Sequence, residues 1–186
     1  PESNGRVHAN LIEVEPGHLV AFMRSRFADN VYISESHDFG DSWTVPEKSV
    51  LPNNNASISA IKLQTGEIAL AYNVNATRNP EFGKVSWPGL RNPVAVSISE
   101  DFGKTWPVGR VLEQAEGFIG PENKTNNAQY EYPTLYQTKD GLLHLVYAYK
   151  NRLCVKYVRC SVEDVFGPKR EADGVYNPTS GEGVEK

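Results

Sequence analysis

The sequence SHDFGDSW at residues 36–43 recurs almost letter for letter as SEDFGKTW at residues 99–106. Both copies fit the pattern Ser-x-Asp-x-Gly-x-Ser/Thr-Trp. This pattern predicts a tight turn, because Asp and Ser side chains satisfy backbone donors and glycine adopts the positive φ that such a turn requires. Tryptophan supplies a large apolar surface for packing against a neighbouring unit. We therefore predict a structural role for the shared positions, which are Ser36, Asp38, Gly40, Trp43, Ser99, Asp101, Gly103 and Trp106.

Three longer segments also repeat, and they align on a turn glycine. They are HANLIEVEPGHLVAFMR (8–24), SISAIKLQTGEIALAYN (57–73) and YPTLYQTKDGLLHLVYA (132–148). Each has runs rich in β-branched and aromatic residues on both sides of the glycine, which predicts an antiparallel hairpin. A third run follows in every unit, and a fourth follows in the first two. These further predicted strands are residues 30–36, 93–100, 153–160, 47–51 and 109–114.

The repeated unit predicts an all-β fold. No segment keeps a helical period over the ~12 residues that a helix requires. A unit of four antiparallel strands, repeated every ~50–75 residues, is typical of a β-propeller blade. We expect a propeller portion over residues 1–166, with blades at about 5–51, 52–115 and 128–166 and no clear fourth strand in the last. Residues 75–90 and 115–131 are expected to be loops, and residues 167–186 a polar linker or tail.

The composition is that of an ordinary globular protein. Of 186 residues, 39% are hydrophobic and 23% charged; the net charge is −4 and no basic run is present, so a nucleic-acid partner is not expected. No run approaches the ~18 apolar residues of a membrane span. Cys154 and Cys160 lie too far apart along one strand, ~20 Å, to form a disulfide. Glycosylation patterns at Asn55, Asn75 and Asn123 favour a secreted or extracellular location.

The repeat itself indicates a site. His8, Ser57 and Tyr132 each stand nine residues before the turn glycine of their unit. They therefore share one register at the start of the innermost strand. In a propeller this register faces the mouth of the central channel, so we expect the three side chains to converge there.

The eight-residue element is similar to the Asp box of sialidases and related BNR-repeat proteins. The stretches LPNNNASISAIKL (51–63), RNPVAVSISEDFGKTW (91–106) and YEYPTLYQTKDGLLHLVYAY (130–149) also resemble the sialidase-like BNR family. The resemblance covers about residues 8–165. It implies a six-bladed sialidase-type propeller of which this piece is the last three blades, the C-terminal half. It also implies that the Asp boxes lie at the periphery, away from the active site.

The resemblance assigns roles to several residues. Tyr132 matches the nucleophilic tyrosine, which is suited to a substrate whose own carboxylate would repel a carboxylate nucleophile. Arg24 and Arg91 match the second and third of three arginines that clamp that carboxylate through a planar fork of donors. Ser57 is the substrate-binding candidate of the middle unit. The first arginine and the catalytic Asp are expected in a front half that this piece lacks.

His8 departs from the family pattern, which has Glu in this register. A neutral imidazole can accept the Tyr132 proton, or the change can mark lost activity or a different substrate. Tyr132 can also be a plain structural residue at a strand start. Glu131 is expected on the opposite face of the strand and thus to be a poor partner for Tyr132. Lys150 and Arg152 are alternative cations near the same mouth.

No cofactor or metal is expected. His18, His37 and His144 show no metal-ligand spacing. Phe39 and Phe102 stand where a calcium loop needs an oxygen ligand.

Two functions therefore remain open. The first is a sialidase-like exo-glycoside hydrolase that acts on terminal acidic sugars once the missing blades complete the pocket, the isolated chain being inactive. The second is a non-catalytic propeller for carbohydrate binding, adhesion or assembly. Arg24, Arg91 and Tyr132 favour the first, whereas His8 and the missing Asp favour the second. The resemblance implies an acidic sugar or glycan as a partner. Three blades would also leave two open apolar faces, so we expect another propeller half or a second copy of the chain to pack on them.

Overall fold

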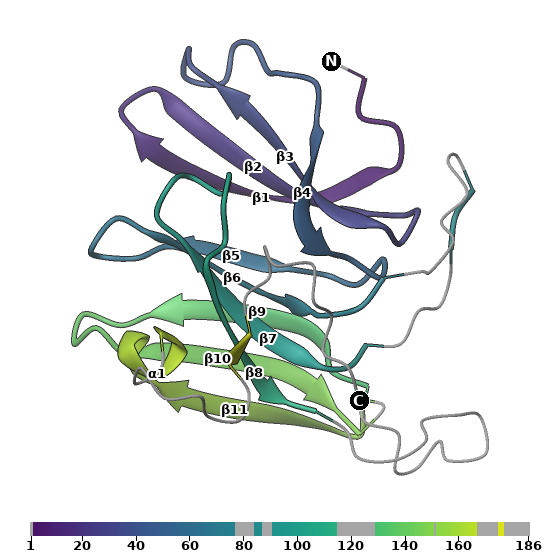
Figure 1. Cartoon of the computed structure of the whole chain (residues 1–186), viewed down its shortest axis with the longest axis vertical. Coiled ribbons are helices and arrows are strands. Elements are labelled where there is room, and N and C mark those ends of the chain that lie inside the picture. Colours follow the sequence, from purple (N-terminus) through teal and green to yellow (C-terminus); the bar gives the residue numbers. More distant parts are fainter. Residues whose placement is uncertain are drawn as a thin grey trace.

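The computed structural model describes residues 2–76, 84–86, 91–114, 129–150, 152–166 and 175–176. In these residues the secondary structure is almost entirely β, arranged in three antiparallel sheets. The sheets follow one another along the long axis of the molecule, in the order of the sequence (Figure 1). The predicted all-β class and the predicted strands are confirmed.

The first and second sheets each contain four consecutive strands in sequence order. The first sheet consists of β1 (Arg6–Glu15), β2 (His18–Ser25), β3 (Asn30–Ser36) and β4 (Glu47–Pro52). The second consists of β5 (Ser59–Lys62), β6 (Ile68–Asn73), β7 (Val94–Ser99) and β8 (Val108–Glu113), with the two-residue β12 (Val175–Tyr176) added at the β8 edge.

The third sheet contains three strands in the described part of the chain. They are β9 (Glu131–Gln137), β10 (Leu143–Tyr149) and β11 (Cys154–Cys160), and the five-residue α1 (Val162–Phe166) follows. The hairpins turn at the three predicted glycines, whose φ values are 79°, 109° and 86° for Gly17, Gly66 and Gly141.

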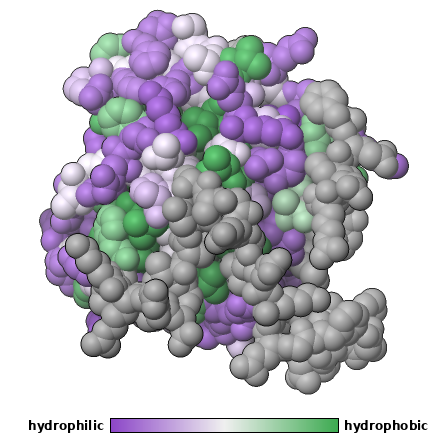
Figure 2. Space-filling model, in the orientation of Figure 1, coloured by the Kyte–Doolittle hydropathy of each residue, from purple (hydrophilic) through white to green (hydrophobic). Residues whose placement is uncertain are grey.

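The central strands of the second sheet are buried on both faces. Every residue of β6 and β7 is buried. Because side chains alternate along a strand, Ile68, Leu70 and Tyr72 enter the core shared with the first sheet, whereas Ala69 and Ala71 enter the core shared with the third. Two separate cores thus join three sheets. The side of the molecule seen in Figure 2 is largely hydrophilic, with separate hydrophobic patches.

The two eight-residue elements form the same turn. In the first, the Asp38 carboxylate accepts hydrogen bonds from the Ser36 hydroxyl at 2.7 Å and from the backbone N–H of Ser42 at 2.9 Å, and the Trp43 indole N–H donates to the Gly40 carbonyl at 3.0 Å. The corresponding bonds in the second are 2.8, 2.8 and 2.9 Å. Hydrogen bonds led by the one from the Ser42 side chain lower the pKa of Asp38 to about 2.

Cys154 and Cys160 are both free thiols, as expected. Asn55 is buried and its amide donates to the Ser86 carbonyl at 3.0 Å, so it is not available as a glycosylation acceptor. Within the described residues no helix is long and apolar enough to span a membrane. Asn123, most of the two expected loops and the tail apart from β12 lie outside the described residues.

Candidate functional site

Tyr132 and His8 occupy the same distorted position in two different sheets. Tyr132 lies at the start of β9 with a φ of 54°, and His8 lies near the start of β1 with a φ of 53°. At each position the strand pairing is irregular, as in a β-bulge. Left-handed φ values are uncommon for residues other than glycine and tend to occur at functional sites. The two positions therefore share a backbone distortion as well as a register.

Arg24 lies in β2, opposite Val7 and next to the His8 irregularity. Burial, and then the positive charges of Arg91 and Arg26, lower the pKa of Arg24, while Tyr132 acts in the opposite direction. Its Nε is buried and has no hydrogen-bond partner among the described residues. Arg24 therefore lies within electrostatic reach of both Arg91 and Tyr132.

Arg91 comes from the segment before β7 and is only 3% exposed. Its Nη1 lies 2.8 Å from Oε1 of Glu131, which is equally buried. Its guanidinium carbon lies 5.6 Å from the centre of the Tyr132 ring. The carbonyl of Arg91 also accepts a hydrogen bond from the Tyr130 N–H at 2.9 Å, which fixes the segment against the start of β9.

Glu131 and Tyr132 are joined by Arg152, which follows β10. The Arg152 Nε donates to Oε2 of Glu131, and its Nη2 donates to Oε1 at 3.2 Å and to the Tyr132 hydroxyl at 3.3 Å. The carboxylate of Glu131, followed by the effect of Tyr132, raises the pKa of Arg152. Glu131 lies on the buried face of β9 and Tyr132, 46% exposed, on the open face. Arg152 therefore contacts side chains on both faces of β9.

The structure thus brings Arg24, Arg91 and Tyr132 together, and it adds Glu131 and Arg152. Sequence analysis named Arg152 only as an alternative cation and placed Glu131 on the opposite face from Tyr132 as a poor partner; the two do lie on opposite faces, but Arg152 links them. The sequence evidence for these two residues was limited to position. Glu131 directly precedes Tyr132, and Arg152 was expected near the same channel mouth.

Within the described residues, no hydrogen bond, ion pair or ring contact joins His8 or Ser57 to this cluster. The His8 side chain is exposed, and within the described residues no hydrogen bond or ring contact joins its imidazole to Tyr132. Ser57 is half-buried. In the middle unit the positive φ falls instead on Asn55, at 61°.

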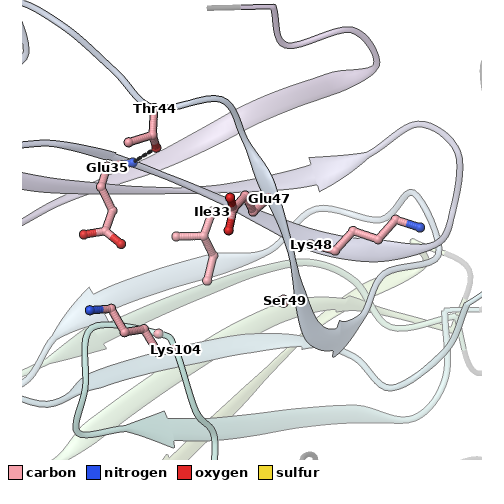
Figure 3. A pocket seen from close by; sticks show the side chains of 8 residues that line it. Ile33, Glu35, Thr44, Glu47, Lys48, Ser49 and Lys104 are labelled. Atoms are coloured by element: carbon pink, nitrogen blue, oxygen red, sulfur yellow. Dashed lines mark hydrogen bonds between the residues drawn. The ribbon is translucent and has the colours of Figure 1, made fainter.

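A second group of polar side chains lies at the other end of β2. His18, Glu35 and His37 offer ligand atoms that all lie within 4.8 Å of one another. Sequence spacing did not reveal this group, because antiparallel pairing of β2 with β3 brings its members together. The eight-residue turn of the second sheet (99–106) lies beside it, since Phe102 contacts the His18 ring, and a cavity of about 330 Å³ opens between that turn and β3–β4 (Figure 3).

A family model described as a BNR repeat-like domain matches residues 1–145. No curated protein matches the sequence. Among solved structures, the Hadza microbial sialidase Hz136 is 17% identical, with a TM-score of 0.64 over 87% of this chain and 28% of its own. The NanB sialidase from Streptococcus pneumoniae is 14% identical, with a TM-score of 0.64 over 84% of this chain and 23% of its own.

The intramolecular trans-sialidase from Ruminococcus gnavus is also similar. It is 17% identical, with a TM-score of 0.62 over 86% of this chain and 33% of its own. At such identities these likenesses concern the fold alone, and the fold that they indicate is of the propeller type. The chain spans between 23% and 33% of the length of these three proteins.

Proposed function

Since the chain belongs to the BNR repeat-like family, we propose that it forms part of a sialidase-like exo-glycoside hydrolase domain that acts on terminal acidic sugars. In this proposal the three sheets are three blades of a six-bladed propeller. Further blades complete the substrate pocket and supply the remaining catalytic groups. The contribution of this chain is a site for the carboxylate of the sugar, built around Arg24 and Arg91.

The observation that carries the proposal is the environment of Arg24. Its buried Nε–H has no acceptor in the described part of the chain. A buried donor without a partner is costly, by about 1–3 kcal/mol, and a carboxylate oxygen would satisfy it with a charge-assisted bond. The neighbouring charge of Arg91 also favours an anion at this position.

The balance of charge near Tyr132 supports the same ligand class. Arg24, Arg91 and Arg152 place three guanidinium groups around it, while Glu131 supplies one carboxylate. The excess of positive charge attracts an anionic group, and guanidinium forks match the geometry of a carboxylate.

Tyr132 is the proposed nucleophile, and Arg152 orients its hydroxyl through the 3.3 Å hydrogen bond. A tyrosine nucleophile also needs a group that accepts its proton. His8 occupies the family register for that group without contacting Tyr132. This observation favours the second candidate function, a propeller that binds acidic sugars without hydrolysing them.

The remaining blades would cover apolar surface on the two outer sheets. Leu11 of the first sheet is 60% exposed, and Val155 and Tyr157 of the third are 71% and 57% exposed. An apolar groove of about 470 Å³ also runs along the first sheet beside Leu11 and Trp43. We propose that another propeller half, or a second copy of this chain, packs on these surfaces.

Replacement of Tyr132 by phenylalanine separates binding from hydrolysis. The variant loses only the hydroxyl, so its affinity for N-acetylneuraminic acid is expected to stay within about twofold of the parent, because the arginines supply most of the binding energy. Release of the sugar from a fluorogenic sialoside by the protein with all its blades is expected to be lost. Hydrolysis that survives in the Tyr132→Phe variant would exclude Tyr132 as the nucleophile. Parent protein that binds but does not hydrolyse would favour the non-catalytic function.

A further inference from the structure

His18, Glu35 and His37 form a compact group of potential metal ligands. His18 begins β2, Glu35 lies near the end of β3, and His37 follows β3 in the Asp-box turn. The Nε2 of His18 lies 2.7 Å from Oε2 of Glu35, and the Nε2 of His37 lies 3.7 Å from the same oxygen. The two imidazole rings are 4.1 Å apart between centroids and are tilted by 31°.

These distances suit a tetrahedral metal ion. A zinc ion with nitrogen and oxygen ligands at ~2.0–2.1 Å requires ligand atoms about 3.3 Å apart. The observed 2.7 and 3.7 Å bracket that separation. Small rotations of the side chains would therefore admit an ion at the centre of the group.

The surroundings of the group hold one ligand in place and leave another accessible. The side chain of His18 is 12% exposed, and its ring packs edge-on against Phe102 of the second sheet at 5.5 Å. Glu35 lines the cavity shown in Figure 3, and its side chain is 22% exposed. His37 is 66% exposed, so an ion would enter from its side.

We propose that His18, Glu35 and His37 bind a divalent ion of the zinc class, with water in the fourth position. Two imidazoles and one carboxylate are a ligand set that zinc and its neighbours in the transition series prefer to calcium or magnesium, which favour oxygen alone. The ion would link β2 to the turn that follows β3, next to the contact between the first and second sheets. The role of the ion would be structural and separate from the arginine cluster, which consists of Arg24, Arg91 and Arg152 around Tyr132.

Binding would stabilise the folded chain by mass action, because His18 of β2 meets Glu35 of β3 and His37 of the following turn only on folding. For a chain of this size, zinc at a hundredfold excess over its Kd is expected to raise the Tm by about 5–10 °C. A chelator should reverse the increase.

The test is a titration of chelator-treated chain with zinc chloride, followed by calorimetry, and with cobalt chloride, followed by the visible absorption of tetrahedral cobalt. We expect one ion per chain, and an affinity weakened about tenfold or more in His37→Ala. His37 is exposed, so this variant should fold; circular dichroism verifies that. The matched control is His8→Ala, an exposed histidine outside the group, which should bind zinc like the parent.

The zinc-dependent rise in Tm provides a second readout and should be present in the parent and in His8→Ala but absent in His37→Ala. Absence of saturable zinc binding by the parent would overturn the proposal. So would equal zinc affinity in His37→Ala and the parent, or loss of binding in the His8→Ala control.

Discussion

Replacement of Trp106 by alanine is expected to lower the free energy of unfolding by about 3–5 kcal/mol, the usual cost of removing a large aromatic side chain from a core. Trp106 is fully buried between the first and second sheets, where its ring meets Phe22 edge-on at 6.0 Å. Its indole N–H also donates to the Gly103 carbonyl at 2.9 Å. The loss should be measured by urea denaturation of the whole chain.

Trp43 provides the matched control, because it holds the same position in the other copy of the turn. It is only half-buried and packs on a small group, Ala21, Met23 and Tyr32, at the outer sheet. Trp43→Ala is therefore expected to cost clearly less than Trp106→Ala. Equal losses in the two variants would contradict the view that Trp106 stabilises the chain by joining two sheets.

Replacement of Glu131 by glutamine is expected to destabilise the chain by about 3–5 kcal/mol, the range for breaking a buried ion pair at one partner. The change keeps the shape of the side chain and removes its charge. Arg91, 3% exposed, would lose the carboxylate that lies 2.8 Å from it. Arg152 would lose its carboxylate partner as well. Urea denaturation again provides the measurement.

Glu113→Gln is the control for this prediction. Glu113 also pairs with a cation, but the side chain of Lys156 is 40% exposed, so solvent screens that pair. We expect Glu113→Gln to lower the free energy of unfolding by less than Glu131→Gln does. If Glu131→Gln were no more destabilising than Glu113→Gln, the buried ion pair would not be holding the arginine cluster together.

The strands could be predicted from the sequence because their signals are local. A turn glycine between two apolar runs is sufficient for a hairpin, and the repeats showed the same unit three times. The short β12 and α1 could not be predicted in this way. β12 exists through its pairing with β8, and α1 has only five residues, too few to show a helical period.

The site could be predicted only in part. The common register of His8 and Tyr132 in the sequence corresponds to a common left-handed φ in the structure. The link from Glu131 to Tyr132 was missed because it depends on Arg152, which lies in the turn between β10 and β11 with a positive φ of 68°. The contact of His18 with Glu35 was missed because it depends on pairing between two strands.

The central claim is that Arg24 binds the carboxylate of an acidic sugar, and a titration of N-acetylneuraminic acid against the parent, Arg24→Ala and Arg26→Ala tests it most directly. Arg26 is an exposed arginine two residues further on, and it serves as the matched control. A charge-assisted contact of about 1.5–3 kcal/mol predicts affinity about tenfold or more weaker in Arg24→Ala. Arg26 acts on Arg24 only through an exposed, solvent-screened charge, so Arg26→Ala is expected to weaken binding by less than about twofold. Equal binding by Arg24→Ala and the parent would contradict the claim.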